Sequence, residues 1–319
     1  MAYQTVFKRY ELKYIITREQ KARILDAMQP YMIPDIYGRS TIRNIYFDTD
    51  DCILARHSIA KPDFKEKLRI RSYSAATSES TVFVELKRKA DHLVYKRRVA
   101  LPECTAMSWT QGLRAGGYPN SQMSTLIPPQ MGREIDYFLS YYGHLRPAVF
   151  LSYDRQAFRM RDDAIAGHTG QTAQHDMDFR VTFDENILFR DYDLSLKSEV
   201  YGTPLLEEGK VLMELKCSGG LPMWMVEVLS AEHVYKTSFS NYGTAYTNYI
   251  HPMQQSMHAA AVRAGNAAGA DSALPAADTR ESRSHRPAMA DSQGSGGRAR
   301  SNQKESSGPS WSRKLLHIS

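Results

Sequence analysis

Alternating polar and apolar residues recur through the first 250 residues of the chain and predict β-strands. The clearest case is segment 65–71, which reads Lys-Glu-Lys-Leu-Arg-Ile-Arg. Successive side chains of a strand point to opposite faces, so one face of this segment carries Lys65, Lys67, Arg69 and Arg71. Four cations in one row repel one another, which favours a polyanion bound along the strand. A solvent-exposed sheet face is the simpler alternative.

The tripeptide Glu-Leu-Lys occurs at 11–13, 85–87 and 214–216, inside strands predicted at 6–16, 81–89 and 211–217. In each copy the Glu and the Lys share one face of the strand, and the Leu lies on the other. The strand predicted after the second copy, 93–101, places Lys96 and Arg98 on one face. Such a face is acidic and basic at once.

The remaining pattern predicts strands at 6–16, 41–48, 147–161 and 179–184. Helices are predicted at 18–28, where Thr17 and Gln20 form a capping box, and at 103–114, 128–142 and 222–230. The last of these helices is apolar nearly all round, so we expect it to be buried or to close an end of the sheet. Short connections between successive strands predict an antiparallel meander. Segment 236–249 completes the ordered domain.

So many like charges cannot be buried in a dry core. Either an open sheet displays them to solvent, or the sheet closes into a barrel whose lumen holds water, an anion and a metal. Glutamates among the cations favour the second arrangement, because a divalent metal between carboxylates and phosphates would explain both. We therefore predict an α+β fold, an antiparallel β-barrel tunnel of about eight strands with peripheral helices.

Composition divides the chain in two. Beyond residue 252 it is rich in Ala, Gly, Ser, Arg and Gln, so we predict a tunnel domain at 1–250 and a disordered low-complexity tail at 251–319. The net charge of +6 favours anionic partners. Cys52, Cys104 and Cys217 suggest neither a disulfide framework nor a zinc site, and no segment predicts a signal peptide or a membrane span. We expect a soluble, cytoplasmic protein.

Familiar catalytic signatures are absent from the sequence. It has no Gly-x-x-x-x-Gly-Lys phosphate loop, no Gly-x-Ser-x-Gly elbow and no His-Glu-x-x-His motif, so side chains must bind any phosphate. The acidic stretch 48–51 could hold a metal, but Asp and Thr beside a strand end are more typical of a turn.

In combination, several short motifs resemble the VTC domain of the triphosphate tunnel metalloenzyme superfamily over about residues 6–249. They read RYELK from Arg9, RNIYFD from Arg43, KLRIR from Lys67, VELK from Val84, YDR from Tyr153, RVTFD from Arg180, MELK from Met213 and SFSNY from Ser238. The resemblance implies an antiparallel tunnel that binds a nucleoside triphosphate and a divalent metal and, in VTC proteins, makes inorganic polyphosphate from ATP. Carried over by motif, it implies that Glu214 holds the metal and that phosphates are held by Lys13, Arg69, Arg71, Lys87, Lys96, Tyr153 and Arg155.

From the strand faces and the resemblance together we predict three sets of site residues. The catalytic set is Lys13, Arg69, Arg71, Lys87 and Arg155. The substrate-binding set is Lys67, Lys96, Arg98, Tyr153, Arg180, Lys216, Lys236 and Ser240. The metal set, for Mn²⁺ or Mg²⁺, is Glu214, Glu85 and Glu11.

One departure from the family pattern concerns the last motif. The family usually has Ser-Lys-Tyr, with that lysine at the active site, whereas this chain has Ser-Asn-Tyr at 240–242. Asn241 brings a hydrogen-bond donor but no charge. Lys236, a few residues earlier, is a candidate replacement, and a protein that binds polyphosphate but catalyses poorly is the alternative.

The predicted function is therefore a polyphosphate polymerase that transfers the γ-phosphate of ATP to a growing polyphosphate chain. Two alternatives stay open: a tunnel triphosphatase that uses water as the nucleophile, and a non-catalytic module that binds polyphosphate. ATP and inorganic polyphosphate are the predicted partners, and no specific nucleic acid is predicted. Whether a membrane-protein partner receives the product is left open.

Overall fold

The computed structural model describes residues 10–60, 63–90, 93–112, 127–165 and 178–270. The chain forms two compact units, residues 1–254 and 255–319, and the β-sheet belongs to the first. The strands are β1 (Tyr10–Thr17), β2 (Met32–Asp48), β3 (Lys65–Ser72), β4 (Thr81–Ala90), β5 (Leu93–Pro102), β6 (Arg146–Met160), β7 (Arg180–Arg190), β8 (Thr203–Pro204), β9 (Lys210–Cys217) and β10 (Lys236–Thr237). The helices are α1 (Arg18–Met28), α2 (Ile53–Ala60), α3 (Glu103–Gly112), α4 (Pro129–Tyr142), α5 (Asp162–Ile165), α7 (Met223–Ala231), α8 (Asn241–Ala245), the π-helix η3 (Tyr246–Ile250) and α9 (His251–Ala270).

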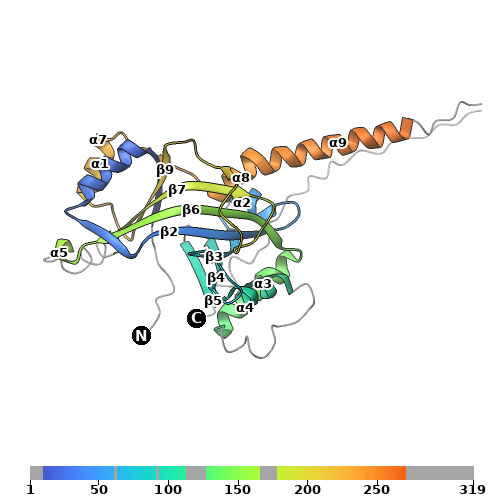
Figure 1. Cartoon of the computed structure of the whole chain (residues 1–319), viewed down its shortest axis with the longest axis horizontal. Helices are drawn as coiled ribbons and strands as arrows, with labels where there is room; N and C mark the ends of the chain where they lie inside the picture. Colours follow the sequence, from blue (N-terminus) through green and yellow to red (C-terminus); the bar gives the residue numbers. More distant parts are fainter. Residues whose placement is uncertain (1–9, 61–62, 91–92, 113–126, 166–177, 271–319) are drawn as a thin grey trace, which may run out of the picture. The chain divides into compact units, whose positions relative to one another are not determined.

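The strands form one ten-stranded antiparallel sheet in the order β10-β1-β9-β7-β6-β2-β3-β4-β5, with β8 paired to β7 (Figure 1). Within the described residues no backbone pairing joins the edge strands β10 and β5, so the sheet is not closed. It is nevertheless curved, because Lys87 Nζ on β4 lies 2.9 Å from Glu11 Oε2 on β1, although five strands separate β1 and β4 in the sheet order. The predicted α+β antiparallel fold is confirmed, with ten strands instead of about eight, but within the described residues the sheet curves without closing into the predicted barrel.

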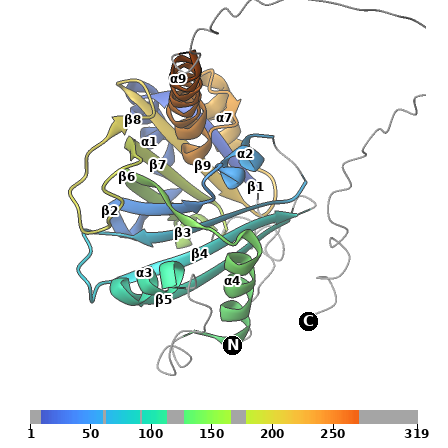
Figure 2. The same ribbon diagram turned by 90° about the vertical axis from the view of Figure 1, so that its right-hand side faces the viewer.

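The outer face of the sheet is apolar and is covered by two pairs of helices. One core lies beneath α1 and α7 and includes Ile16, Phe183 and Met213. A second core lies beneath α3 and α4 and includes Ile70 and Val84. Figure 1 shows the two helix pairs at opposite ends of the sheet, and Figure 2 gives the view after a turn of 90°. The inner face is thus the face left for the alternate, charged residues of each strand.

Part of the inner face is apolar as well. A third core includes Ala55 of α2, Tyr153 of β6 and Tyr242 of α8. The Tyr242 hydroxyl donates a hydrogen bond of 2.6 Å to Asp48 Oδ2, and the Asp48 carboxylate also accepts from the backbone amides of Leu54 and Ala55 in α2. The acidic stretch 48–51 is therefore a turn and a helix cap, as its residue types indicated.

The helix predicted at 18–28 is confirmed together with its capping box, in which Thr17 and Gln20 exchange hydrogen bonds of 3.2 and 2.9 Å. The expected burial of the apolar helix at 222–230 is wrong in part: α7 buries Met225 and Leu229, but Met223 is 69% exposed. The chain also stays helical in α9, inside the segment predicted to be a disordered tail. The alanines of α9 have the highest intrinsic helix propensity of any residue type.

Candidate functional site

The strand register collects the predicted cations on the inner face. On one side of the sheet, Lys67 of β3 pairs with Lys87 of β4, and Lys87 pairs with Lys96 of β5, so three lysines stand directly opposite one another. Two residues further along each strand, the next row on the inner face consists of Tyr46, Arg69, Glu85 and Arg98. Like charges directly opposite in a sheet destabilise it. This part of the inner face, on β3, β4 and β5, is called the cationic half below.

Glu85 is the counterion at the centre of the cationic half. Its carboxylate lies 2.7 Å from Arg69 Nη2, 2.7 Å from Lys96 Nζ and 3.4 Å from Arg98 Nε, and its side chain is 1% exposed. Burial by itself would raise the pKa of Glu85, but the charges of Arg69 and Arg71 and of Lys96 outweigh it and hold the pKa far below its usual range. Glu85 is therefore ionised at neutral pH.

The two arginines of β3 are oriented by neutral partners, of which the sequence analysis predicted Tyr153 for the site but missed Tyr46 and Asn44. Arg69 Nη1 donates to the Tyr46 hydroxyl at 2.8 Å. Arg71 donates to Asn44 Oδ1 at 2.9 Å and to the Tyr153 hydroxyl at 3.0 Å. Tyr46 and Asn44 alternate along β2 with apolar residues, and this period-two pattern was the available signal for their place on the inner face. Burial raises the pKa of Tyr46, but Arg69 and Arg71 outweigh it, and the net shift is downward.

Two lysines of the cationic half have lowered pKa values. Burial, followed by repulsion from Lys13 and Lys87, lowers the pKa of Lys67 to about 7. Burial also lowers the pKa of Lys96, to about 8, although Glu85 partly restores it. Lys67 Nζ donates to Ser240 Oγ at 3.1 Å, and a hydroxyl cannot neutralise an ammonium. Among the described residues, the hydroxyl of Ser240 therefore leaves the charge of Lys67 uncompensated.

The opposite side of the inner face, on β1, β9, β7 and β6, is called the balanced half, because its cations have carboxylate partners. Lys216 Nζ and Lys13 Nζ lie 2.6 and 3.7 Å from the Glu214 carboxylate. Arg155 forms two hydrogen bonds of 2.6 Å with Asp184. Burial alone would raise the pKa of Glu214, but Lys216, Lys13 and Arg155 hold it far below its usual range.

Residues 8–250 of the chain match the VTC domain. The chain belongs to the VTC domain family. The resemblance predicted from the tunnel motifs is confirmed, and the matched residues include both halves of the inner face. A comparison with curated proteins gave no match. Within the described part of this VTC chain, no helix combines the length and the apolar character needed to cross a bilayer.

Solved structures similar to this VTC domain include two from bacteria. A candidate adenylate cyclase of Bacillus halodurans is 14% identical, with a TM-score of 0.41, and the match covers 74% of this chain and 96% of that chain. A candidate adenylate cyclase of Vibrio parahaemolyticus is 9% identical, with a TM-score of 0.39, and the match covers 76% of this chain and 100% of that chain.

Two residues predicted for substrate binding lie away from the centre of the VTC site. Lys236 pairs with Tyr14 on β1, whereas the next residue, Thr237, pairs with Lys13. Lys236 thus shares the outer face with Tyr14 and cannot replace the missing family lysine, which corrects that prediction. Arg180 lies opposite Lys216 on the inner face but is exposed at the first residue of β7. Ser240 caps α8, and Asn241 is its first residue.

The three predicted metal ligands do not form one site. Among the described residues no group of three or more His, Cys, Asp or Glu side chains could hold a metal ion. Glu85 is enclosed by cations and does not fit that role, so its assignment is corrected to a counterion. Glu11 and Glu214 lie on the paired strands β1 and β9. Burial raises the pKa of Glu11, Lys87 lowers it and Glu214 raises it, with a net downward shift, so the two carboxylates interact.

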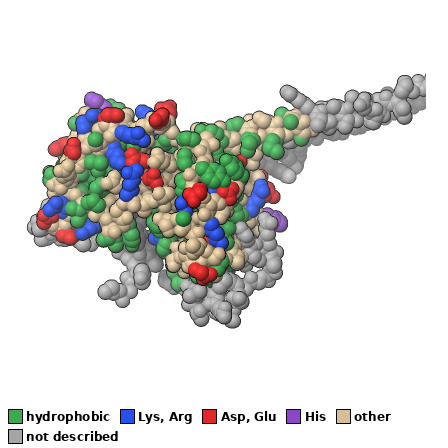
Figure 3. All heavy atoms as spheres, in the orientation of Figure 1, with side chains coloured by type: hydrophobic (Ala, Val, Ile, Leu, Met, Phe, Trp, Pro, Cys, Tyr) green, Lys and Arg blue, Asp and Glu red, His purple; other side chains and the backbone are tan. Residues whose placement is uncertain are grey.

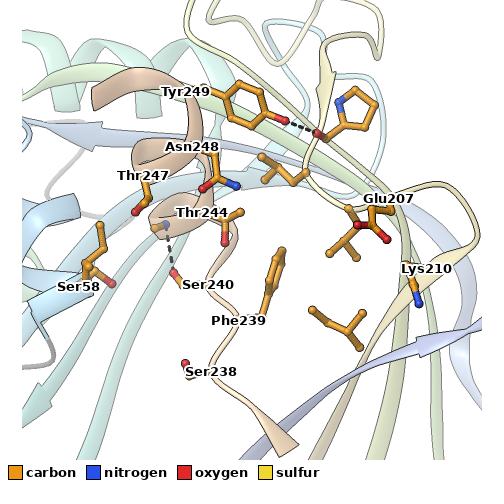
Figure 4. Close-up of a pocket in the computed structure, with 16 residues that line it drawn as sticks. Ser58, Glu207, Lys210, Ser238, Phe239, Ser240, Thr244, Thr247, Asn248 and Tyr249 are labelled. Atoms are coloured by element: carbon orange, nitrogen blue, oxygen red, sulfur yellow. Dashed lines mark hydrogen bonds between the residues drawn. The ribbon is translucent and has the colours of Figure 1, made fainter. Parts of the chain in front are cut away.

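A cavity of about 770 Å³ adjoins the lysines (Figure 4). Phe239 and Ser240 line this cavity and also contact the lysines. The backbone carbonyl of Phe239 accepts a hydrogen bond from Lys13 Nζ at 3.0 Å, and Ser240 Oγ accepts one from Lys67 Nζ. The rest of the lining is mostly apolar or neutral, with the side chains of Thr244 and Asn248 toward the cavity in Figure 4. By contrast, on the molecular face drawn in Figure 3, Lys and Arg lie interspersed with Asp and Glu.

Proposed function

We propose that this VTC domain is a polyphosphate polymerase that transfers the γ-phosphate of ATP to a polyphosphate chain. The observation that carries the proposal is the cationic half, where Lys67, Lys87 and Lys96 stand opposite one another beside Arg69 and Arg71. Glu85 is too deeply enclosed to neutralise all of them. A polyanion running across the three strands would place one phosphate against each cation and relieve their repulsion.

The chemistry requires little beyond alignment and neutralisation of charge. The terminal oxygen of the polyphosphate chain forms a bond to the γ-phosphorus, and the bond from that phosphorus to the β,γ-bridging oxygen breaks, so that ADP leaves with the electron pair. The nucleophilic oxygen is already anionic at neutral pH, so no general base is needed. We assign the alignment to Arg69, Arg71, Lys67, Lys87 and Lys96, with Arg98 at the exposed side of the row.

The balanced half would bind the divalent cation. Mg²⁺ and Mn²⁺ are usually held by one or two carboxylates together with substrate phosphates, and Glu214 with Glu11 meets that requirement. The ion would neutralise charge on the transferred phosphoryl group. Lys13 and Lys216, which contact Glu214 in the structure, would then be free to turn to phosphate oxygens. Arg155 is held by Asp184 and would contribute its remaining donor.

The cavity beside Ser240 would take the nucleoside of ATP. A mostly neutral lining with an aromatic ring and an amide suits a flat heteroaromatic base, whereas it offers little to a phosphate chain. Because Phe239 and Ser240 contact both the cavity and the lysines, a nucleotide whose base is in the cavity has its triphosphate beside Lys13 and Lys67. The test is selective: Asn248→Ala should weaken ATP binding and leave tripolyphosphate binding unchanged.

The activity test incubates the purified full chain with ATP and Mn²⁺ and separates the products by gel electrophoresis and anion exchange. Polyphosphate chains with ADP support the proposal. Orthophosphate with ADP and no chains would instead identify a tunnel triphosphatase, in which water replaces the chain end. Absence of both products, with tripolyphosphate still bound, would leave a binding module and refute the enzyme assignment.

A further inference from the structure

Two arginines on the outer face of the sheet carry buried charge for which the fold supplies too few acceptors. Arg43 on β2 alternates with Ile42 and Asn44 of the inner face, so it points away from the phosphate site. It is 7% exposed, and across the described part of the chain its Nε and Nη1 have no hydrogen-bond partner. Arg43 belongs to one of the family motifs, but no function described above uses it.

The second arginine, Arg190 on β7, lies on the same face, one row along from the row of Arg43 and Ser152. Its guanidinium stacks between the rings of Phe150 and Tyr201, at 3.7 and 4.2 Å. Its Nε donates to Asp193 O at 3.1 Å and its Nη1 to Tyr201 O at 2.9 Å, while Nη2 is buried without a hydrogen bond in the described structure. This Nη2 has only a loose ionic contact, 3.6 Å from Asp193 Oδ2.

Ser152 lies between the two guanidinium-bearing strands. It pairs directly with Arg43 across β2 and β6, and the neighbouring outward residue of β6, Phe150, pairs with Arg190. Ser152 is fully buried, and its hydroxyl lacks a partner among the described residues as well. Donors from three adjacent strands are thus left unsatisfied at one place on the outer face.

The two arginines interact electrostatically. Burial lowers the pKa of Arg190, Tyr201 and Asp193 raise it, and the charge of Arg43 lowers it again, with a net downward shift. Arginine nevertheless stays protonated, so both charges remain. The Asp193 carboxylate is 40% exposed and already accepts from the Tyr201 hydroxyl at 2.6 Å, so it compensates the charge of Arg190 only weakly. A buried, uncompensated charge is strongly destabilising.

We propose that Arg43, Arg190 and Ser152 bind one buried tetrahedral oxyanion, of the phosphate or sulfate class, at a site separate from the inner face. An ordered water could satisfy some of these donors but would bring no charge. Guanidinium groups match the geometry of oxyanions, and the serine hydroxyl supplies a further donor. Because these groups are buried beneath segment 191–201, the anion would act as a structural ion, taken up when the outer face packs.

The test measures anions released from the full chain. Protein is refolded with orthophosphate or with sulfate, saturated with tripolyphosphate in metal-free buffer so that the inner face is occupied, and separated from free ions by gel filtration. It is then denatured, and the released anions are identified by ion chromatography. We expect one orthophosphate or sulfate per chain from the natural protein and from Arg69→Gln, and none from Arg43→Met.

Thermal unfolding provides the second measurement. It also shows whether each variant is folded, so that loss of the anion can be distinguished from misfolding. Orthophosphate at a hundredfold excess over its Kd should raise the Tm of the natural protein by about 5–10 °C in the presence of saturating tripolyphosphate. Arg43→Met should fold without this response, and Ser152→Ala should show a smaller one. Equal release from Arg43→Met and the natural protein, no release from either, or an equal response to chloride would overturn the proposal. Because neither readout uses ATP, failure of the polymerase assay would leave this result intact.

Discussion

The two halves of the inner face use the same residue types in different proportions. In the balanced half, cations meet carboxylates in pairs: Lys216 with Glu214, and Arg155 with Asp184. In the cationic half, one buried carboxylate, Glu85, is shared by the cations of the two flanking strands, β3 and β5. Charge pairs stabilise a sheet by themselves, whereas unpaired cations require a ligand. The comparison therefore supports the proposal that the phosphate chain binds on β3, β4 and β5 and the metal on β1 and β9.

The largest expected effect is a difference in stability between variants of Glu85, in the cationic half, and of Glu214, in the balanced half. Glu85→Gln removes the most deeply buried counterion of the cationic half and should lower the free energy of unfolding, measured without added ligand, by about 3 kcal/mol. Glu214→Gln should cost less, about 1–2 kcal/mol, because its partners Lys13 and Lys216 are partly exposed and can turn toward solvent, while Arg155 keeps its pair with Asp184. Urea denaturation of both variants measures the difference. If Glu85→Gln were as stable as Glu214→Gln, the assignment of Glu85 as a counterion would be wrong.

The next effect concerns binding. Arg69→Gln removes a charged donor from the centre of the cationic half, and we expect tripolyphosphate affinity to fall about 30-fold and polyphosphate synthesis to fall at least as much. Calorimetry at fixed ionic strength measures the affinity. The matched control is Arg97→Gln: Arg97 is also on the sheet but faces outward, where it binds Glu134 of α4 at 2.8 and 3.0 Å. Equal losses in both variants would show a general charge effect instead of a site.

Affinity should also depend on pH through Lys67. In the empty protein its pKa is about 7, and a bound polyanion favours the charged form and raises that pKa. Binding therefore takes up a proton, and above pH 7 the affinity should fall by up to about tenfold per pH unit until the pKa of the complex is reached. Lys67→Met should lose this part of the pH profile while keeping the contribution from titration of the ligand itself. An identical profile in both proteins would remove Lys67 from the site.

The smallest expected effect restores the family lysine. Asn241→Lys places an ammonium in the first residue of α8, beside Ser240 and thus close to the cationic half. We expect tripolyphosphate affinity and synthesis to rise a few-fold, about the gain from one partly exposed charge. Lys236→Gln should change neither, because Lys236 lies on the outer face. A loss of activity in Lys236→Gln would mean that this segment rearranges when substrate binds.

Local patterns predicted much of the fold. Alternation in segments such as 65–71 and 81–89 identified β3 and β4, and a capping box identified the start of α1. Where the pattern is interrupted, prediction was poorer. The first part of β2, from Met32, was missed because Pro34 and Gly38 break the alternation, and the register shifts there, between Pro34 and Arg39.

The charge pairing within the site was less predictable. Period-two alternation placed Glu11, Glu85 and Glu214 on the same face, but it could not tell which cations each would meet, because those partners come from strands far apart in sequence. Lys236 was misassigned for a related reason. The face that each residue of the two-residue strand β10 occupies depends on its register with β1. Proximity in sequence to Ser240 does not determine that face.

The sequence by itself determined which residues alternate, hence that rows of cations and glutamates occupy one face of an antiparallel sheet, and its motifs determined the family. Only the tertiary structure decided which charges neutralise one another, that Glu85 contacts several cations, and that Arg43 and Arg190 are buried in neighbouring rows of the opposite face. Alternation is a local property of the backbone, whereas Coulomb energies and desolvation depend on distances and burial that exist only after distant strands have been brought together.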